Sequence, residues 1–138
     1  MGTRYDFGRA GEVRLANGGR VPLRIATADG FRGRFLGLMG MRSLDGGCGL
    51  LLKGCTSIHM CFMRFAIDVI WIGETDAQGV TEVLRVDSEV RPWRVAFGPK
   101  GARSCIEVAS GWTPVGPEGV FIPAYKPGDG GGSLNYLS

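Results

Sequence analysis

Residues 67–86 read IDVIWIGETDAQGVTEVLRV, and this stretch decides the fold. Residues 67–72 are rich in β-branched and aromatic side chains, which favour strands. The polar segment 74–79 ends on a glycine, and a second strand-like run follows over 80–86. A polar turn between two such runs predicts an antiparallel β-hairpin.

Further short strands are predicted on both sides of this hairpin. A second hairpin is expected over 13–15 and 21–25, around the turn signal Asn17-Gly18-Gly19. The other expected strands cover 49–52, 57–63, 104–109 and 119–124, and one short helix is expected over 31–39. We therefore predict a mainly β fold with a minor helical part, a small rolled sheet or partly open β-barrel with one short helix.

The length of 138 residues is typical of one domain. The 24 glycines follow no repeat and suit turns between short strands. We expect a loose N-terminal arm over 1–11, a single domain over 12–125 and a flexible glycine-rich tail over 126–138.

The charge pattern argues against two classes of partner. The net charge is only +3 and no basic run is visible, so a nucleic-acid partner is not expected. No segment approaches the roughly 20 apolar residues of a membrane span, and the first residues lack the apolar core of a signal peptide. We expect a cytoplasmic protein with reduced cysteines and no membrane partner.

The polar side chains that could carry chemistry gather around His59, the one histidine of the chain. His59, Cys61 and Met63 would share a face if the strand over 57–63 is unbroken. The cysteine spacing matches no paired-ligand pattern, so no metal and no other cofactor is expected.

Three charged residues allow two interpretations each. Arg64 and Asp68 could pair and fix a corner between strands, or Arg64 could bind an anion together with His59 and Arg34. Glu107 lies in an apolar strand, where it either faces solvent or pairs with an inward-facing arginine. The sequence leaves both choices open.

Several of these residues lie in motifs that resemble the uncharacterised DUF192 (UPF0127) family. The motifs are RFLGLM over 34–39, GLLL over 49–52, and SIH with FMRF and IDV over 57–69. Two later blocks, 91–94 and 106–111, are also similar, so the resemblance covers roughly residues 20–112. It implies a small, mainly β domain with a short helix and brings no activity with it.

The resemblance also marks positions and shows departures. The marked residues are Arg34, Gly37, Met39, His59, Met63, Arg64, Asp68 and Glu107. Ala66 stands where the family usually has proline, and Met41 stands where an arginine often follows the GLM block. If the arginine at the Met41 position binds a ligand in relatives, that role is absent here or is taken by Arg42.

Three functions follow as hypotheses. The first is a non-catalytic binding module with a polar pocket for a small anionic or polar ligand, whose candidate residues are Arg34, His59, Arg64, Asp68 and Glu107. The second is a hydrolase-type enzyme with His59 as general base beside Asp68 or a cysteine. The third is a protein-interaction or assembly factor with an apolar surface of Met39, Met41, Met60, Phe62 and Trp93.

Overall fold

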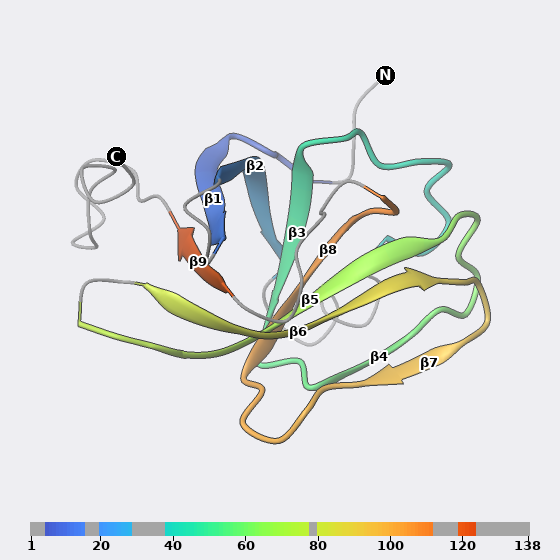
Figure 1. Ribbon diagram of the computed structural model, residues 1–138. Helices are drawn as coiled ribbons and strands as arrows, with labels where there is room; N and C mark the ends of the chain where they lie inside the picture. Colours follow the sequence, from blue (N-terminus) through green and yellow to red (C-terminus); the bar gives the residue numbers. More distant parts are fainter. Residues whose placement is uncertain (1–4, 16–19, 29–37, 78–79, 112–118, 124–138) are drawn as a thin grey trace.

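The computed structural model describes residues 5–15, 20–28, 38–77, 80–111 and 119–123. Figure 1 shows a rolled sheet with a second, small sheet beside it. The strands are β1 (Arg9–Leu15), β2 (Arg20–Ala28), β3 (Cys48–Lys53), β4 (Ser57–His59), β5 (Ile67–Thr75), β6 (Thr81–Val90), β7 (Val95–Phe97), β8 (Ser104–Ala109) and β9 (Gly119–Pro123).

Seven strands form a barrel in the order β1-β2-β3-β8-β5-β6-β9. Among these described strands, only β2 and β3 pair in parallel; the other neighbours are antiparallel. The barrel closes through β9, which pairs with β1 over five residue pairs but with β6 only at Thr81 and Glu82. The predicted mainly β fold, a rolled sheet or partly open barrel, is confirmed.

The two predicted hairpins are present as β1–β2 and β5–β6. The strand predicted over 57–63 is wrong in extent, because β4 ends at His59. The chain turns at the next residue: the Met60 carbonyl accepts hydrogen bonds from the amides of Met63 and Trp93. His59, Cys61 and Met63 consequently do not share one strand face. One strand was not predicted from the sequence: β7, which pairs with β4 as a separate two-stranded sheet.

Residues 5–15 are the described part of the N-terminal region. Tyr5 and Phe7 stack edge to face and pack against the core, and β1 begins at Arg9. The helix predicted over 31–39 lies mostly outside the described residues, of which Leu38 and Met39 form a turn. The described ranges contain no helix, and the predicted tail lies outside them.

Apolar side chains gather in two cores, one on each side of the barrel wall. The inner core contains Leu23, Ile25, Ile70, Ile72, Val83, Ile106 and Val108. Gly49 lies on the inner face, where a Cβ atom would come within 2.9 Å of Ile106 Cγ2 and 3.1 Å of Ile25 Cδ1. Glycine at this position therefore permits the close packing of β3 on the inner core.

The outer core joins the barrel to the β4–β7 sheet. Trp71 and Leu50 from the barrel wall pack there with Ile58, Met60 and Met63, which lie outside the barrel, and all five side chains are buried. Figure 1 shows the β4–β7 sheet as a separate layer beside β5 and β6. One face of this small sheet is thus used for packing, and its other face is turned outward.

Candidate binding surface

The candidate residues from the sequence lie in different places. Arg34 lies outside the described residues. His59 is half-buried in β4, and Arg64 is exposed in the segment before β5. Asp68 pairs with Val108 of the inner core, whereas Glu107 pairs with Leu50 of the outer core. Asp68 and Glu107 are therefore on opposite faces of the sheet.

Asp68 holds two backbone segments together. Its carboxylate is almost fully buried, and Oδ1 accepts from the Glu89 amide at 2.8 Å while Oδ2 accepts from the Gly111 amide at 3.0 Å. Glu89 lies in an irregular part of β6, where two residues of β5 span three of β6, and its φ of 52° is left-handed. Both Asp68 oxygens bind main-chain amides, and the pair with Arg64 considered from the sequence is not seen. Asp68 fixes the bend at the end of β6.

Glu107 is a buried carboxyl group on the outer-core face of β8. Its Oε1 atom has no hydrogen-bond partner, and burial raises its pKa from 4.5 to about 8. The solvent-facing alternative is therefore wrong, and the side chain is mostly neutral at pH 7. Burial also raises the pKa of the neighbouring Cys105 thiol, and electrostatic repulsion from Glu107 and Cys55 raises it further. A thiol with a raised pKa is a poor nucleophile.

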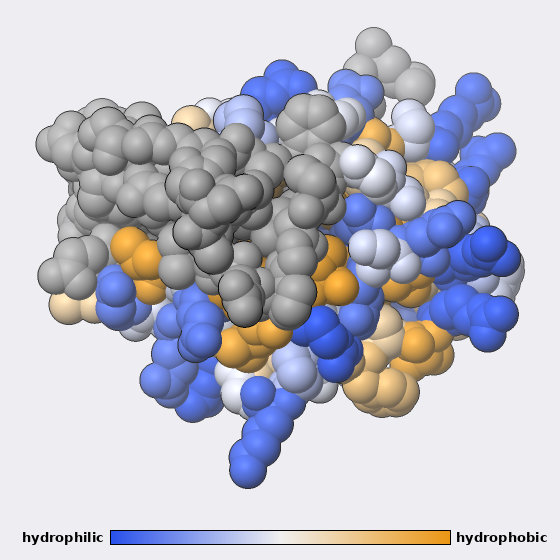
Figure 2. Space-filling view, in the orientation of Figure 1, coloured by the Kyte–Doolittle hydropathy of each residue, from blue (hydrophilic) through white to orange (hydrophobic). Residues whose placement is uncertain are grey.

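A cluster of exposed apolar side chains lies on the outward face of the β4–β7 sheet and the turns beside it. Phe62 and Trp93 are each 62 % exposed, Val95 is 57 % exposed and Phe97 is 68 % exposed. The rings of Phe62 and Trp93 lie in contact, with centroids 4.9 Å apart. Figure 2 shows hydrophobic side chains over the region where Figure 1 places β4 and β7, with hydrophilic side chains beside them. We call these four residues the aromatic surface.

The two ring-bearing turns have strained backbones. Phe62 has a φ of 62° and Trp93 a φ of 69°, a left-handed conformation that is rare for bulky residues. Each costs on the order of 1–3 kcal/mol. Buried Met60 holds both turns: its amide donates to the Arg94 carbonyl at 2.7 Å, and its carbonyl accepts from Trp93 at 2.7 Å. The fold thus maintains a strained arrangement that presents two aromatic rings to solvent.

An open groove of about 670 Å³ lies next to the aromatic surface. Residues 87–91, at the end of β6 and the following turn, line one side, and residues 94–97, mainly β7, line the other. Val95 and Phe97 belong to both the groove and the aromatic surface. The two features therefore form one continuous candidate site.

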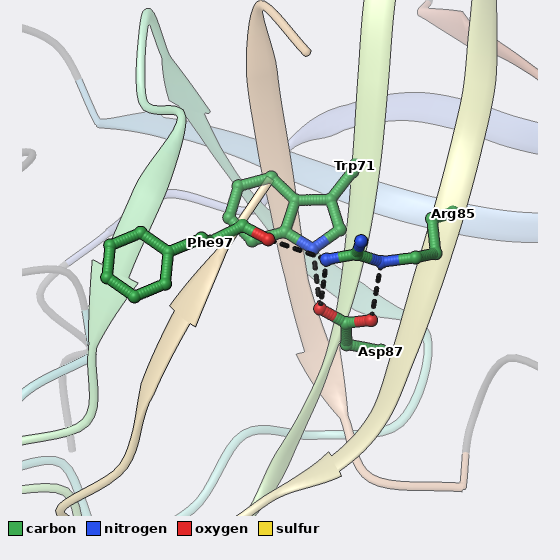
Figure 3. A network of polar contacts seen from close by, with 4 residues as sticks. All are labelled: Trp71, Arg85, Asp87 and Phe97. Carbon is green, nitrogen blue, oxygen red and sulfur yellow. Dashed lines mark hydrogen bonds and ion pairs between the residues drawn. The ribbon is translucent and has the colours of Figure 1, made fainter. Parts of the chain in front are cut away.

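A polar network fixes β7 against the barrel (Figure 3). The indole nitrogen of buried Trp71 donates to Asp87 Oδ2 at 2.8 Å, and Arg85 binds both oxygens of Asp87 at 2.8 and 2.9 Å. Arg85 also donates to the main-chain carbonyl of Phe97. Figure 3 shows the Phe97 ring pointing away from this network. These residues were not among the candidates from the sequence, because Asp87 lies one position beyond the strand predicted over 80–86. A strand continued by one residue would have placed Arg85 and Asp87 on the same face.

The charges beside the aromatic surface are mainly positive. Arg91 lies 3.7 Å from Glu89 in an exposed pair, which is a weak interaction. Arg64 and Arg94 are also exposed, and neither has an ion-pair partner among the described residues. These guanidinium groups leave the site suited to negatively charged partners.

Two findings on metal ligands and membrane spans concern the described residues. They contain no group of three His, Cys, Asp or Glu side chains placed to hold a metal ion. Nδ1 of His59 accepts a hydrogen bond from the Cys61 amide at 3.3 Å. No helix among them has the length and apolar character needed to cross a membrane.

Two solved structures share this fold. The first is a protein from Sinorhizobium meliloti 1021 that is provisionally described as a transcription regulator, with a TM-score of 0.76, 17% identity, and coverage of 89% of this chain and 98% of that one. The second is a protein of unknown function from Novosphingobium aromaticivorans DSM 12444, with a TM-score of 0.70, 16% identity, and coverage of 81% and 82%. At these identities the similarity shows the fold alone.

A family model accounts for most of the chain. A search of curated proteins finds no match to this chain. The model of DUF192, described as an uncharacterized ACR, matches residues 13–115, which include β3 to β8 and both sides of the groove. The chain belongs to the DUF192 family.

Proposed function

We propose that this protein is a non-catalytic binding module that recognises a protein partner through the aromatic surface. One observation carries the proposal: four large apolar side chains, each more than half exposed, gather on one face, and the fold holds two of them in strained backbone conformations. The proposal develops the interaction hypothesis from the sequence. Phe62 and Trp93 are exposed as that hypothesis requires, whereas Met60 is buried and acts as their support.

Physical reasons favour a protein partner. Aromatic residues are enriched at the centres of protein interfaces, where they bury large areas and lose little conformational freedom. The Phe62–Trp93 contact fixes both rings before binding, which lowers the entropy cost of association. Arg64 and Arg94 add positive charge, so the partner segment is expected to combine apolar and acidic side chains.

The small-ligand pocket of Arg34, His59, Arg64 and Asp68 has less support. Both carboxylate oxygens of Asp68 are occupied by main-chain amides, and Asp68 belongs to the inner row of the barrel. His59 pairs with Val95, which turns its side chain to the outward face of the small sheet.

Peptide selection tests the proposal. Random 12-residue peptides displayed on phage are selected on the wild-type protein, and the affinities of the winners are measured by fluorescence polarisation. We expect Trp93→Ala to weaken binding at least about tenfold, as for a residue at the centre of an interface. The matched control is Glu82→Ala, an exposed residue at the other end of β6, which should bind like wild type. Equal binding to wild type and Trp93→Ala would contradict the proposal.

A further inference from the structure

We infer that the groove between β6 and β7 takes an extended acidic peptide segment, which adds as a strand to the open edge of β7. The inference rests on the proposed function and specifies how the partner binds. Among the described strands, β7 pairs with β4 alone, so one of its edges has no neighbour. Such an edge presents unpaired main-chain groups that an extended peptide can bind.

Two hydrogen bonds show which main-chain groups face the groove. The Gly98 amide donates to the Thr56 carbonyl at 2.8 Å, so Gly98 is directed at the β4 side. Successive residues in a strand point their main-chain groups to opposite edges, so Phe97 and, two residues earlier, Val95 face the other way. The Phe97 carbonyl indeed accepts from Arg85 of β6. The amide and carbonyl of Val95 and the amide of Phe97 therefore face the groove.

The opposite wall leaves room for the added strand. Beyond Glu82, β6 has no second strand neighbour among the described residues. Its end bends at Glu89, where Asp68 holds the bulge, and the Arg85 link to β7 stands at one end of the groove. The space between these walls, about 670 Å³, is open to solvent.

Charge favours an acidic peptide over a second copy of this chain. The groove lining holds the carboxylates of Asp87 and Glu89 as well as Arg91 and Arg94. Asp87 pairs with Arg85 and Glu89 with Arg91, so Arg94, at the start of the β7 wall, is the lining charge with no ion-pair partner among the described residues. An acidic side chain of an added strand would lie near the Arg94 guanidinium group. Edge-to-edge pairing of two copies would instead bring their arginines together, and each chain already carries a net charge of +3.

The test uses a selected peptide synthesised in two N-methylated forms, one modified at odd positions and one at even positions. An added strand donates hydrogen bonds from alternate residues only. We expect one form to lose at least about tenfold in affinity and the other to bind within about threefold of the parent. Val95→Pro, which removes an amide facing the groove, should bind about tenfold more weakly than Val95→Ala, which keeps it. Acidic residues should be enriched among the winners, and Arg94→Glu should weaken their binding.

The outcomes separate this inference from the proposed function. Equal binding of the two methylated forms overturns strand addition, while dependence on Trp93 would still support the aromatic surface. If the selected peptides bind wild type and Trp93→Ala equally, or if no peptide is selected, both the strand-addition inference and the proposed function are overturned. A dimer that Val95→Pro abolishes assigns the edge to a second copy and overturns the inference. Displacement of the peptide by a 15-residue oligothymidylate assigns the groove to a single strand of nucleic acid instead.

Discussion

Replacing Glu107 with glutamine should reverse its effect on stability between acidic and neutral pH. Burial raises the Glu107 pKa to about 8 in the folded protein, against 4.5 for the free group. Between these values the native state holds a proton that the unfolded chain has lost. The free energy of unfolding therefore falls as pH rises through this window, by about 1.4 kcal/mol per pH unit.

The size of the effect follows from the width of the window. Between pH 4.5 and about 8, titration of Glu107 lowers the free energy of unfolding by about 5 kcal/mol in total. About 3 kcal/mol of this decrease has occurred by pH 7. Glutamine has nearly the same shape and does not titrate, but its buried amide costs about 1–2 kcal/mol if it stays unpaired. We expect Glu107→Gln to be less stable than wild type at pH 4.5 and more stable at pH 7 and above.

The assay is urea denaturation of both proteins at half-unit intervals from pH 4.5 to 8.5. All other titrating groups are common to the two proteins, so the difference between their unfolding free energies reports Glu107 alone. We expect that difference to change by several kcal/mol and to change sign between about pH 5 and 6. Parallel curves would refute the reasoning, because they would mean that Glu107 is ionised in the native state.

Three further substitutions test the structural account, each by chemical denaturation. Asp68→Asn should lower the free energy of unfolding by about 1–3 kcal/mol, because the amide of Glu89 or of Gly111 then faces an NH2 group. An unchanged stability would argue against the role of Asp68 in holding these two backbone segments together. Trp93→Gly should be about 0.5–1 kcal/mol more stable than Trp93→Ala, because φ is 69° there; the usual opposite order would mean that the turn is not strained. Gly49→Ala should lower the free energy of unfolding by about 1–3 kcal/mol, because a Cβ would lie 2.9 Å from Ile106 Cγ2. An unchanged stability would show that the inner core repacks around the added methyl group without strain.

The parts of the fold that were predictable from the sequence depend on local patterns. The β5–β6 hairpin and β8 are encoded by runs rich in β-branched and other apolar residues, and the hairpin also by its polar turn; the structure has both elements. The end of β4 at His59 is different, because it depends on hydrogen bonds between Met60 and residues more than thirty positions away. A short strand such as β7 carries too few residues for a periodic signal.

The candidate site was less predictable for a related reason. Aromatic residues next to buried strands are usually core residues, so the exposure of Phe62 and Trp93 depends on two turns that only the tertiary structure reveals. Asp68 and Glu107 were both recognisable as polar residues in apolar strands. Their different roles, a clamp on backbone amides and a neutral buried acid, depend on which side of the barrel wall each one faces.

The most direct test of the aromatic surface is a map of backbone amide shifts by nuclear magnetic resonance as a selected peptide is added. We predict that the largest changes lie at Phe62, Trp93, Val95 and Phe97, with smaller ones along residues 87–91. The amides of the inner core should change little, because that core is closed to solvent. Changes concentrated elsewhere, with these four residues unaffected, would contradict the assignment of this surface as the binding site.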